Sequence, residues 1–411
     1  MGYIDKNLRP IFFTLLANFI LFGISLTIIG ATLPKIIADF QWSYISTGIV
    51  LSAGSIGYFV SSFVAGILLQ KLGPKKVIVI GMGLQFVGLL FFASTPFVLL
   101  NMLLNLMIGF GGGGTEVVVN FSMVKMERSG QSRLMNFMHA AFSVGAVVGP
   151  YIVIMLMRAE LGWQMIYRIM AFVSLAMAVV FCFLPLSRLN GVEEEKSEEK
   201  VRTTSILRDP VLILSFLILL IYVGSELGVS NWVSEYYVKF FKASADVGAF
   251  MVSIFWIGLL AGRLGTSIIY KGSRPEAVAL GLACLCTVSL IFALLIRTPI
   301  VAGIGFCLAG LGYSAIYPLI MALVGRHFKT TQGAAVGFAA TGGGIGSFVF
   351  PFIMAAISNA FGIRKGFFFY IALNVLMVVM ITTIVTYTSK LTVRGSGHGI
   401  QIKQNNGNYQ H

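Results

Sequence analysis

The sequence has few charged residues, and acidic ones are the scarcest. Asp and Glu total 15 of 411 residues against 29 Lys and Arg, and only 11% of the chain is charged while 57% is hydrophobic. Soluble domains carry about twice this share of charge, so the composition excludes an ordinary soluble protein. The net charge of +14 does not indicate nucleic-acid binding, because the basic residues are spread over many short segments.

Cysteine is also scarce, and the common catalytic and metal-binding motifs are missing. The four cysteines all fall in apolar runs, without the spacing of a metal site, and we expect neither disulfides nor bound metal: Cys182, Cys284, Cys286 and Cys307. The glycines at 111–114 are not followed by the Lys-Ser/Thr pair of a phosphate-binding loop, and no catalytic triad or zinc site is visible. We therefore expect neither an enzyme nor an ATP-driven pump, and no cofactor.

What the chain has instead is a series of apolar runs of roughly 20 residues, the length that crosses a bilayer core. Helices satisfy their own backbone hydrogen bonds in lipid, so these runs predict an all-α integral membrane protein. Breaks at charged residues, Pro and Gly give twelve transmembrane helices. They are expected at 11–33, 46–69, 76–94, 97–123, 134–157, 165–186, 210–230, 247–270, 276–296, 299–324, 334–358 and 365–387.

The Lys and Arg residues predict the orientation of these helices. With the N-terminus inside, the inner connections hold 20 of them and the outer connections seven, so both termini are expected to be cytoplasmic. The predicted division is an N-terminal six-helix half (1–186), a cytoplasmic linker (187–209), a C-terminal six-helix half (210–387) and a cytoplasmic tail (388–411). We expect a multi-pass protein of the plasma or inner membrane.

The two halves repeat one another. "GAVVGP" at 145–150 matches "GSFVFP" at 346–351, a displacement of 201 residues. The segment from Gly66 to Lys76, "GILLQKLGPKK", has the spacing of the loop signature between the second and third helices of the major facilitator superfamily, although Gln70 stands where that signature usually has an acid. The whole chain resembles this superfamily. The resemblance implies a solute site between the halves at mid-membrane, with access alternating from one side to the other.

Four segments resemble a narrower group, the fucose–glucose–galactose permeases, which includes proton-coupled sugar symporters. They are "TEVVVN" (115–120), "RLMNFMHAAFSVGAVVGP" (133–150), "YVGSELGVSNWVSEYY" (222–237) and "GLGYSAIYPLIMAL" (310–323). One departure is that the first helix lacks the carboxylate of the fucose permease type. The Gly-x3-Gly-Pro at 145–150 is also similar to the proton-driven drug antiporters, but Asn105 stands where those have Arg.

Glu116 is the most informative residue. A carboxylate among lipid tails costs several kcal/mol, so it should face the bundle interior or a wet cavity. Asn120 lies one helical turn further on the same face, and we expect the glycines before Glu116 to let a neighbouring backbone approach closely. Glu116 either binds solute or carries a proton, or it is a fixed partner of His139. His139 is itself a candidate proton relay or a packed histidine, and Asn136 is expected at the membrane boundary.

The second half offers further candidates. Glu226 is interpreted as a second binding or coupling carboxylate, or as the partner of a cation such as Arg168 across the outer gate. Trp232 is either a sugar platform or, more commonly, an interfacial aromatic. Tyr313 and Tyr317 are one turn apart and predicted on one face, either presented to the cavity or packed between helices.

Two basic residues complete the set of candidates. Arg263 lies within a predicted span and needs a partner; we expect a contact with Glu116 across the halves, with snorkelling to the inner surface as the alternative. Lys71, in the superfamily-like loop, is a candidate gating residue.

The expected function is proton-coupled uptake of a sugar or related small polar solute by alternating access. Two alternatives stay open: a drug or metabolite exporter of the same fold, and a membrane sensor that binds solute without transporting it. The expected partners are the solute, a coupling proton and the lipid bilayer, with no nucleic acid; a monomer is compatible with the sequence.

Overall fold

The computed structural model describes residues 5–127, 133–189, 207–270 and 272–405, and nearly all of these are helical. Two short 3₁₀ helices, η1 (Lys6–Leu8) and η2 (Leu186–Leu189), accompany the long helices. The long helices are α1 (Arg9–Phe40), α2 (Tyr44–Phe91), α3 (Val98–Met126), α4 (Arg133–Arg158), α5 (Met165–Phe183), α7 (Pro210–Phe240), α8 (Ala245–Ile269), α9 (Pro275–Leu295), α10 (Pro299–Tyr313), α11 (Ile316–His327), α12 (Gln332–Phe361) and α13 (Ile363–Asn405).

Within the described residues, eleven helical segments are long and apolar enough to cross a membrane. One of them, α2, has 48 residues and is interrupted at Gly73, whose φ of 75° and ψ of 166° are not helical. Glycine adopts this backbone without a steric penalty, and Pro74 then begins the next helical segment. Counting α2 as two spans, and α10 with α11 as one, gives the twelve transmembrane helices predicted from the sequence.

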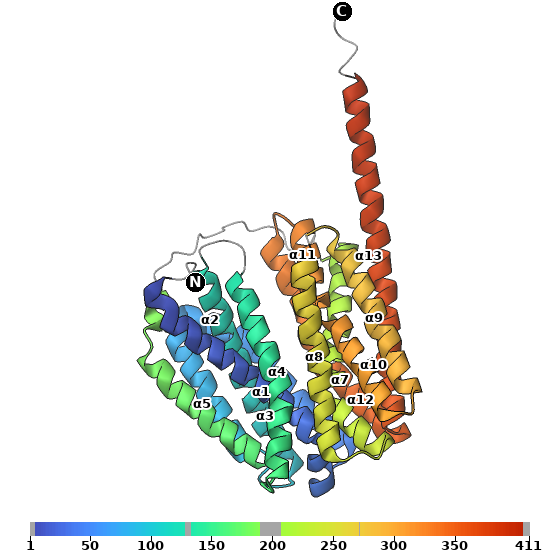
Figure 1. Cartoon of the computed structure of the whole chain (residues 1–411). Coiled ribbons are helices and arrows are strands. Elements are labelled where there is room, and N and C mark those ends of the chain that lie inside the picture. Colours follow the sequence, from blue (N-terminus) through green and yellow to red (C-terminus); the bar gives the residue numbers. More distant parts are fainter. Residues whose placement is uncertain (1–4, 128–132, 190–206, 271, 406–411) are drawn as a thin grey trace, which may run out of the picture.

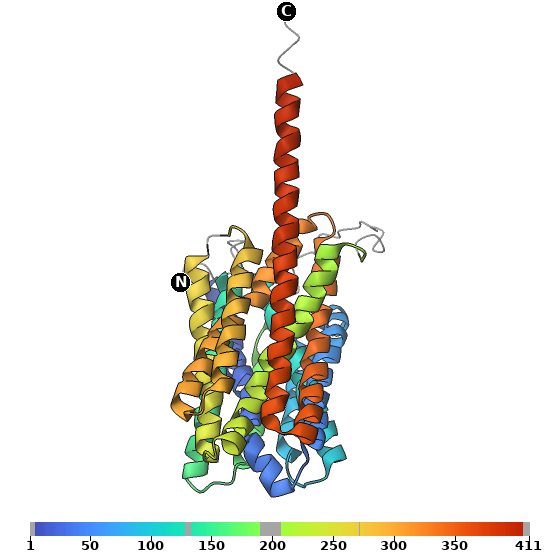
Figure 2. The same ribbon diagram turned by 90° about the vertical axis from the view of Figure 1, so that its right-hand side faces the viewer.

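The helices form two bundles that lie side by side, α1 to α5 in one and α7 to α13 in the other (Figure 1). We call the end at which α1 begins and α13 leaves the bundle the termini side, and the opposite end the far side. α13 continues past the span predicted to end at residue 387 and projects from the termini side (Figure 2). Most of the predicted linker falls outside the described residues.

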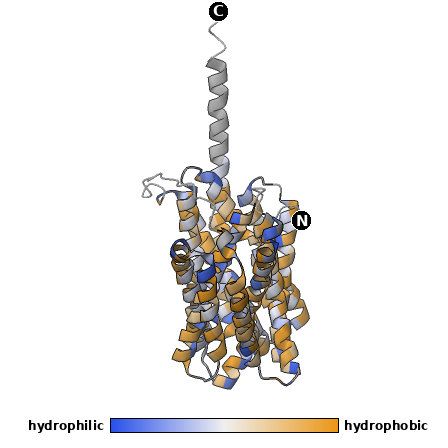
Figure 3. Ribbon diagram, turned by 90° about the vertical axis from the view of Figure 1, so that its left-hand side faces the viewer, coloured by the Kyte–Doolittle hydropathy of each residue, from blue (hydrophilic) through white to orange (hydrophobic). Residues whose placement is uncertain are grey.

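The outside of the bundles is apolar, as Figure 3 shows. Large hydrophobic side chains are strongly exposed along the spans, among them Phe172 (58%), Phe183 (84%) and Ile268 (81%). Such a surface would drive a soluble protein to aggregate, but it suits a lipid environment.

Close helix crossings through glycine follow the 201-residue repeat. Gly109 of α3 packs on the carbonyl oxygen of Gly54 in α2, and Gly310 of α10 packs on that of Phe255 in α8. A Cβ at either glycine would clash with the neighbouring backbone. The members of these two crossings are displaced by 201 residues. Three further pairs of crossings have the same displacement or come within one residue of it: Gly57 on Leu106 and Gly258 on Cys307, Gly111 on Gln85 and Gly312 on Cys286, Gly145 on Ile20 and Gly346 on Leu220.

The glycine run of α3 therefore has the packing role expected from the sequence. Gly109 and Gly113 pack on the first span of α2, and Gly111 packs on the second. Small residues on two faces of α3 allow it to lie between both spans of α2. This packing holds the next turn of α3, which carries Glu116, at a fixed place in the bundle.

Candidate functional site

Glu116 is half-buried on α3 and is held by a residue from another helix. The hydroxyl of Tyr58, on α2, donates a hydrogen bond to its Oε2. Asn120 is a second polar neighbour, as expected for residues one turn apart on the same helix face. The charge of Arg263, from the other bundle, also acts on this carboxylate. Glu116 therefore faces the interface between the bundles rather than lipid.

Arg263 on α8 joins the two bundles. Its Nη1 donates to the Ser143 hydroxyl of α4 over 3.1 Å, and its Nε donates to the Ser314 carbonyl over 3.2 Å. That carbonyl lacks its usual helical donor four residues on, because Pro318 has no N–H. Arg263 therefore supplies the hydrogen-bond donor that this carbonyl lacks at the break between α10 and α11. The expected direct contact between Arg263 and Glu116 is not seen among the described residues: the guanidinium donates its hydrogen bonds to the two serines, and only its charge acts on the carboxylate.

The second carboxylate, Glu226, is buried on α7 at 6% exposure. Tyr222, one turn earlier on α7, and the charge of Arg263 both act on it. The charge of one guanidinium therefore acts on two carboxylates, one from each bundle: Glu116 and Glu226. These three formal charges leave the site with a net charge of −1 when both carboxylates are ionised.

The predicted pairing of Glu226 with Arg168 is wrong. Arg168 lies at the far side of the other bundle, where it donates to the carbonyls of Leu89 (3.2 Å) and Phe92 (2.6 Å) and to the Ser94 hydroxyl (2.9 Å). The last carbonyls of a helix have no partner inside the helix, and a basic side chain satisfies them well. Arg168 is thus occupied at the end of α2.

His139 is exposed on α4 and lies edge-on to Phe19 of α1, with ring centroids 6.2 Å apart. The positive charge of Arg263 acts on it. It is therefore near the charged cluster, but Glu116 is held by Tyr58 and Asn120 instead of by His139 as one reading proposed. The side chain of Asn136 lies outside the described part of the chain.

The two tyrosines of the predicted tenth span have different environments. Tyr313 is fully buried and accepts a hydrogen bond of 2.6 Å from Nδ2 of Asn374, so it packs between helices. Tyr317 is half-buried, its ring centroid lies 6.3 Å from that of Tyr222, and it is close enough to Glu116 for the charge of that carboxylate to act on it. Both rings nevertheless lie beside Tyr222, with centroid distances of 6.2 Å and 6.3 Å, so the two tyrosines face the same side as expected, although the helix breaks at Ser314 and Ala315 between them.

Trp232 and Lys71 lie away from the charged cluster. Trp232 is fully buried near the far side, with its ring edge-on to Tyr44 of the other bundle at 5.5 Å, so the interfacial reading is wrong. Lys71 is exposed on the termini side, two residues before the break at Gly73. Its gating role stays a prediction, because no contact among the residues that the structure describes tests it.

Sequence reasoning missed the aromatic residues around the cluster. The Phe22 ring stacks on Tyr58 at 6.3 Å, and Phe142 lies edge-on to Trp256 of the other bundle at 5.7 Å. The Trp256 indole donates to Ser230 over 2.7 Å. The repeat offered a signal for Tyr58, because its counterpart 201 residues later lies one turn before Arg263.

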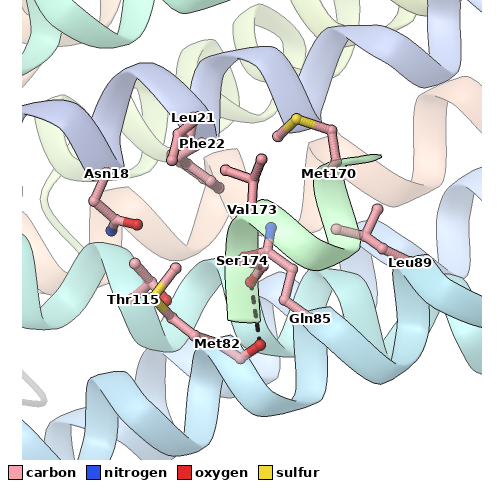
Figure 4. Close-up of a pocket in the computed structure, with 10 residues that line it drawn as sticks. All are labelled: Asn18, Leu21, Phe22, Met82, Gln85, Leu89, Thr115, Met170, Val173 and Ser174. Atoms are coloured by element: carbon pink, nitrogen blue, oxygen red, sulfur yellow. Dashed lines mark hydrogen bonds between the residues drawn. The ribbon is translucent and has the colours of Figure 1, made fainter. Parts of the chain in front are cut away.

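A separate small pocket lies inside the first bundle, among α1, α2, α3 and α5 (Figure 4). Asn18 and Thr115 point into it, and each has a buried polar atom without a hydrogen-bond partner among the described residues. The Ser174 hydroxyl donates to the Met82 carbonyl over 3.2 Å. The pocket has room for about one water molecule and is too small for a solute.

Most of the hydrogen bonds between the two bundles lie toward the far side. Arg263 bonds to Ser143 six residues before α8 ends at the termini side, and four further pairs lie closer to the far ends of their helices. They are Tyr44 with Glu235 (3.0 Å), Arg158 with Asp246 (3.1 Å), Ser52 with the Phe348 carbonyl (2.9 Å) and Ser253 with the Val147 carbonyl (2.8 Å). This distribution indicates bundles that are closed together at the far side.

Comparisons with known proteins agree with this architecture. A family model described as Major Facilitator Superfamily matches residues 15–331. Bypass of stop codon protein 6 of Saccharomyces cerevisiae is 24% identical over 389 residues, covering 85% of this chain and 77% of the yeast protein. A TsgA homologue of Serratia proteamaculans is 24% identical over 337 residues, covering 80% and 83%.

Solved structures share the fold at low identity. The nucleoside transporter NupG superposes with a TM-score of 0.74 at 15% identity, covering 93% of this chain and 99% of that one. A D-xylose–proton symporter gives 0.70 at 15% identity, covering 92% and 97%. FucP in the outward conformation gives 0.62 at 18% identity, covering 92% and 99%.

Proposed function

Since this chain belongs to the major facilitator superfamily and is a membrane transporter rather than an enzyme, we propose that it couples the movement of protons to the uptake of a sugar or a related polyhydroxylated solute. The observation that carries this proposal is the shared cation. Arg263 acts on a carboxylate in each bundle, Glu116 and Glu226, at the interface between them. Transporters of this architecture bind solute at that place.

Solute binding is supported by the chemistry around the cluster. Carboxylate and amide groups such as Glu116 and Asn120 can bind paired hydroxyls. The rings of Phe22, Tyr58 and Trp256 provide the apolar faces on which the C–H side of a sugar ring packs. The solved structures of similar fold include a D-xylose–proton symporter and a nucleoside transporter.

Coupling follows from competition for the guanidinium. When both carboxylates are ionised, Arg263 attracts both and holds the two bundles together at mid-membrane through Ser143. Protonation of Glu116 removes one attraction and changes the relative stability of the two arrangements of the bundles, which is the requirement for coupling. In this proposal the termini side is cytoplasmic, the protein lies in the cell membrane, and the two bundles, with boundaries at 186 and 210, rock as units.

The test is uptake in liposomes that contain the full-length protein. Labelled hexoses, pentoses and nucleosides are supplied with and without an inward proton gradient, for wild type, Glu116→Gln and Glu160→Gln. Glu160 is an exposed carboxylate in the α4–α5 connection, so its variant is a matched control for the loss of a negative charge.

We expect gradient-driven uptake that Glu116→Gln abolishes while solute exchange persists, and that Glu160→Gln leaves unchanged. Uptake that is equally fast with and without the proton gradient contradicts proton coupling. Uptake of nucleosides alone contradicts the sugar assignment but keeps the transport mechanism. If no solute is taken up and cells that express the protein resist lipophilic cations, the protein is an exporter instead of an uptake system.

A further inference from the structure

A third carboxylate, Glu235, lies between the bundles at the far side and has no place in the proposal above. It stands on α7 about two and a half turns beyond Glu226. The hydroxyl of Tyr44, the first residue of α2 in the opposite bundle, donates to its Oε1 over 3.0 Å. The Tyr44 ring also packs edge-on against Trp232. Tyr44 therefore inserts into the side of α7 and closes the far side over Glu235.

The environment of Glu235 compensates its charge poorly. Its side chain is 1% exposed, and its Oε2 has no hydrogen-bond partner among the described residues. The nearest cation, Lys239, lies one turn further on α7 with its Nζ 4.0 Å from Oε1, and half of its own side chain is in solvent. A buried carboxylate with one neutral donor and one distant, solvated cation pays a desolvation cost that these partners do not repay.

Several titratable groups at the far ends of the neighbouring helices are engaged elsewhere. Asp39 of α1 accepts from the Trp163 indole over 2.6 Å, and Arg364 of α13 donates to the Leu294 carbonyl over 3.0 Å. On α8, Asp246 pairs with Arg158. On α7 itself, the Tyr237 hydroxyl donates to Pro299 and the Tyr236 hydroxyl has no partner among the described residues. The groups that act on Glu235 are thus Tyr44 and Lys239.

We propose that Glu235 is a proton-binding site of the far-side gate, and that the gate formed by Tyr44, Trp232 and Glu235 closes when this carboxyl is protonated. The reason is the change of solvent. When the bundles separate at the far side, Tyr44 leaves α7 and water reaches Glu235, which favours the ionised form. When they close, the carboxyl is dry and the neutral form is favoured, with Oε2 available to carry the proton.

The direction of the pH effect follows from the thermodynamic linkage between proton binding and conformation. A proton that binds better to the closed arrangement must stabilise that arrangement, so lowering the pH shifts the population from far-side open to far-side closed. A single proton changes this ratio by at most about tenfold per pH unit. The inference rests on the proposed transport function for its physiological use, because it would let outside protons drive closure behind a bound solute.

The experiment measures conformation and needs neither solute nor flux, so its failure is separate from failure of the proposed transport. Spin labels are placed at Leu161→Cys and Phe361→Cys, exposed far-side positions in opposite bundles, with the four native cysteines replaced. Distances between the labels are measured by pulsed electron resonance in lipid nanodiscs at about pH 8 and about pH 5.5, a range chosen to reveal a one-proton transition.

We expect the wild-type population to shift toward the shorter distance at low pH. Glu235→Gln, a neutral isostere, should give the short distance at both values, while Glu160→Gln keeps the wild-type response. Tyr44→Phe removes the hydrogen bond but keeps the ring, and should shift the midpoint of the transition. A wild-type protein without any pH response, or a Glu235→Gln variant that responds like wild type, overturns the proposal.

Discussion

Glu116 and Tyr317 occupy equivalent positions in the two halves and face each other across the interface. They are 201 residues apart, the displacement that also relates the glycine crossings on which their helices pack. Their side chains are close enough to interact electrostatically. The counterpart of Arg263 under the same displacement is Ser62. The helices of the two halves are thus related by the repeat, and the charged residues of the site stand at positions where the two halves differ in sequence.

The first prediction concerns the geometry of Arg263. Arg263→Lys keeps the positive charge but has a single nitrogen, which cannot reach both Ser143 and the Ser314 carbonyl at once. We expect solute binding to persist and transport turnover to fall by roughly tenfold or more, as for the loss of about one charged hydrogen bond. The measurement compares equilibrium solute binding with counterflow in liposomes.

Ser143→Ala provides the matched test of the same contact from the other bundle. It removes the hydroxyl that Arg263 reaches across the interface and leaves both carboxylates and the cation in place. Turnover should fall in the same direction as for Arg263→Lys, by a smaller factor. Unchanged turnover in both variants would show that the inter-bundle hydrogen bond is not part of the transport cycle.

The second prediction concerns the glycine crossings. Gly109→Val and Gly310→Val place side chains against the backbone of α2 and α8, respectively. Both should lower stability by about 1–3 kcal/mol or prevent folding, because overpacked crossings must separate. Gly66→Val and Gly265→Val are the controls, since a Cβ at either position meets no atom within 4 Å. Thermal unfolding in detergent, followed by intrinsic fluorescence, measures the difference, and equal midpoints for the two pairs would contradict the packing role.

The sequence predicted the parts of this molecule that depend on solvent. Apolar length fixed the twelve spans, and the cost of a charge in lipid identified Glu116, Glu226 and Arg263 as interior groups. It could not give the partners, because these depend on the rotation of helices from different bundles. The partner of Arg168 was predicted wrongly for this reason. Tyr58 was missed because a tyrosine in a membrane span, unlike a charged residue, has no large cost of burial that would single it out.

Helix irregularity was the second limit. The sequence predicted one continuous tenth span, but the helix breaks at Ser314 and Ala315, shortly before Pro318. The position of the proline was visible in the sequence. The sequence did not show that Arg263 donates a hydrogen bond to the carbonyl that the proline leaves unpaired. A proline in a span frees a carbonyl four residues earlier, and a nearby cation in the same bundle is a candidate to fill it.

The third prediction concerns Tyr58. Tyr58→Phe removes the hydroxyl that donates to Glu116 and keeps the ring that stacks on Phe22. Without this donor the ionised form of Glu116 loses stabilisation, so protonation should become easier and the pH profile of proton-driven uptake should move to higher pH. The control is Tyr151→Phe, because Tyr151 is an exposed tyrosine on α4. A profile that moves to lower pH, or not at all, contradicts the assignment of Tyr58 to Glu116.

The last prediction uses two buried asparagines that differ in their partners. Asn101 donates to the carbonyls of Thr95 and Phe97 and accepts from the Ala93 N–H, so it fixes the α2–α3 connection. Asn18 is buried to a similar degree, at 2% exposure against 1%, but its Nδ2 has no partner among the described residues. Asn101→Leu should lower stability by about 1–3 kcal/mol, because it leaves buried backbone groups unpaired.

Asn18→Leu should leave the unfolding midpoint unchanged or raise it, because the substitution removes an unpaired buried donor and fills the pocket that it shares with Thr115. The same thermal unfolding assay measures both variants. Destabilisation by Asn18→Leu equal to that of Asn101→Leu would mean that the pocket holds a water molecule bonded to Asn18 and Thr115, since only displacement of such a partner makes the loss of the amide costly.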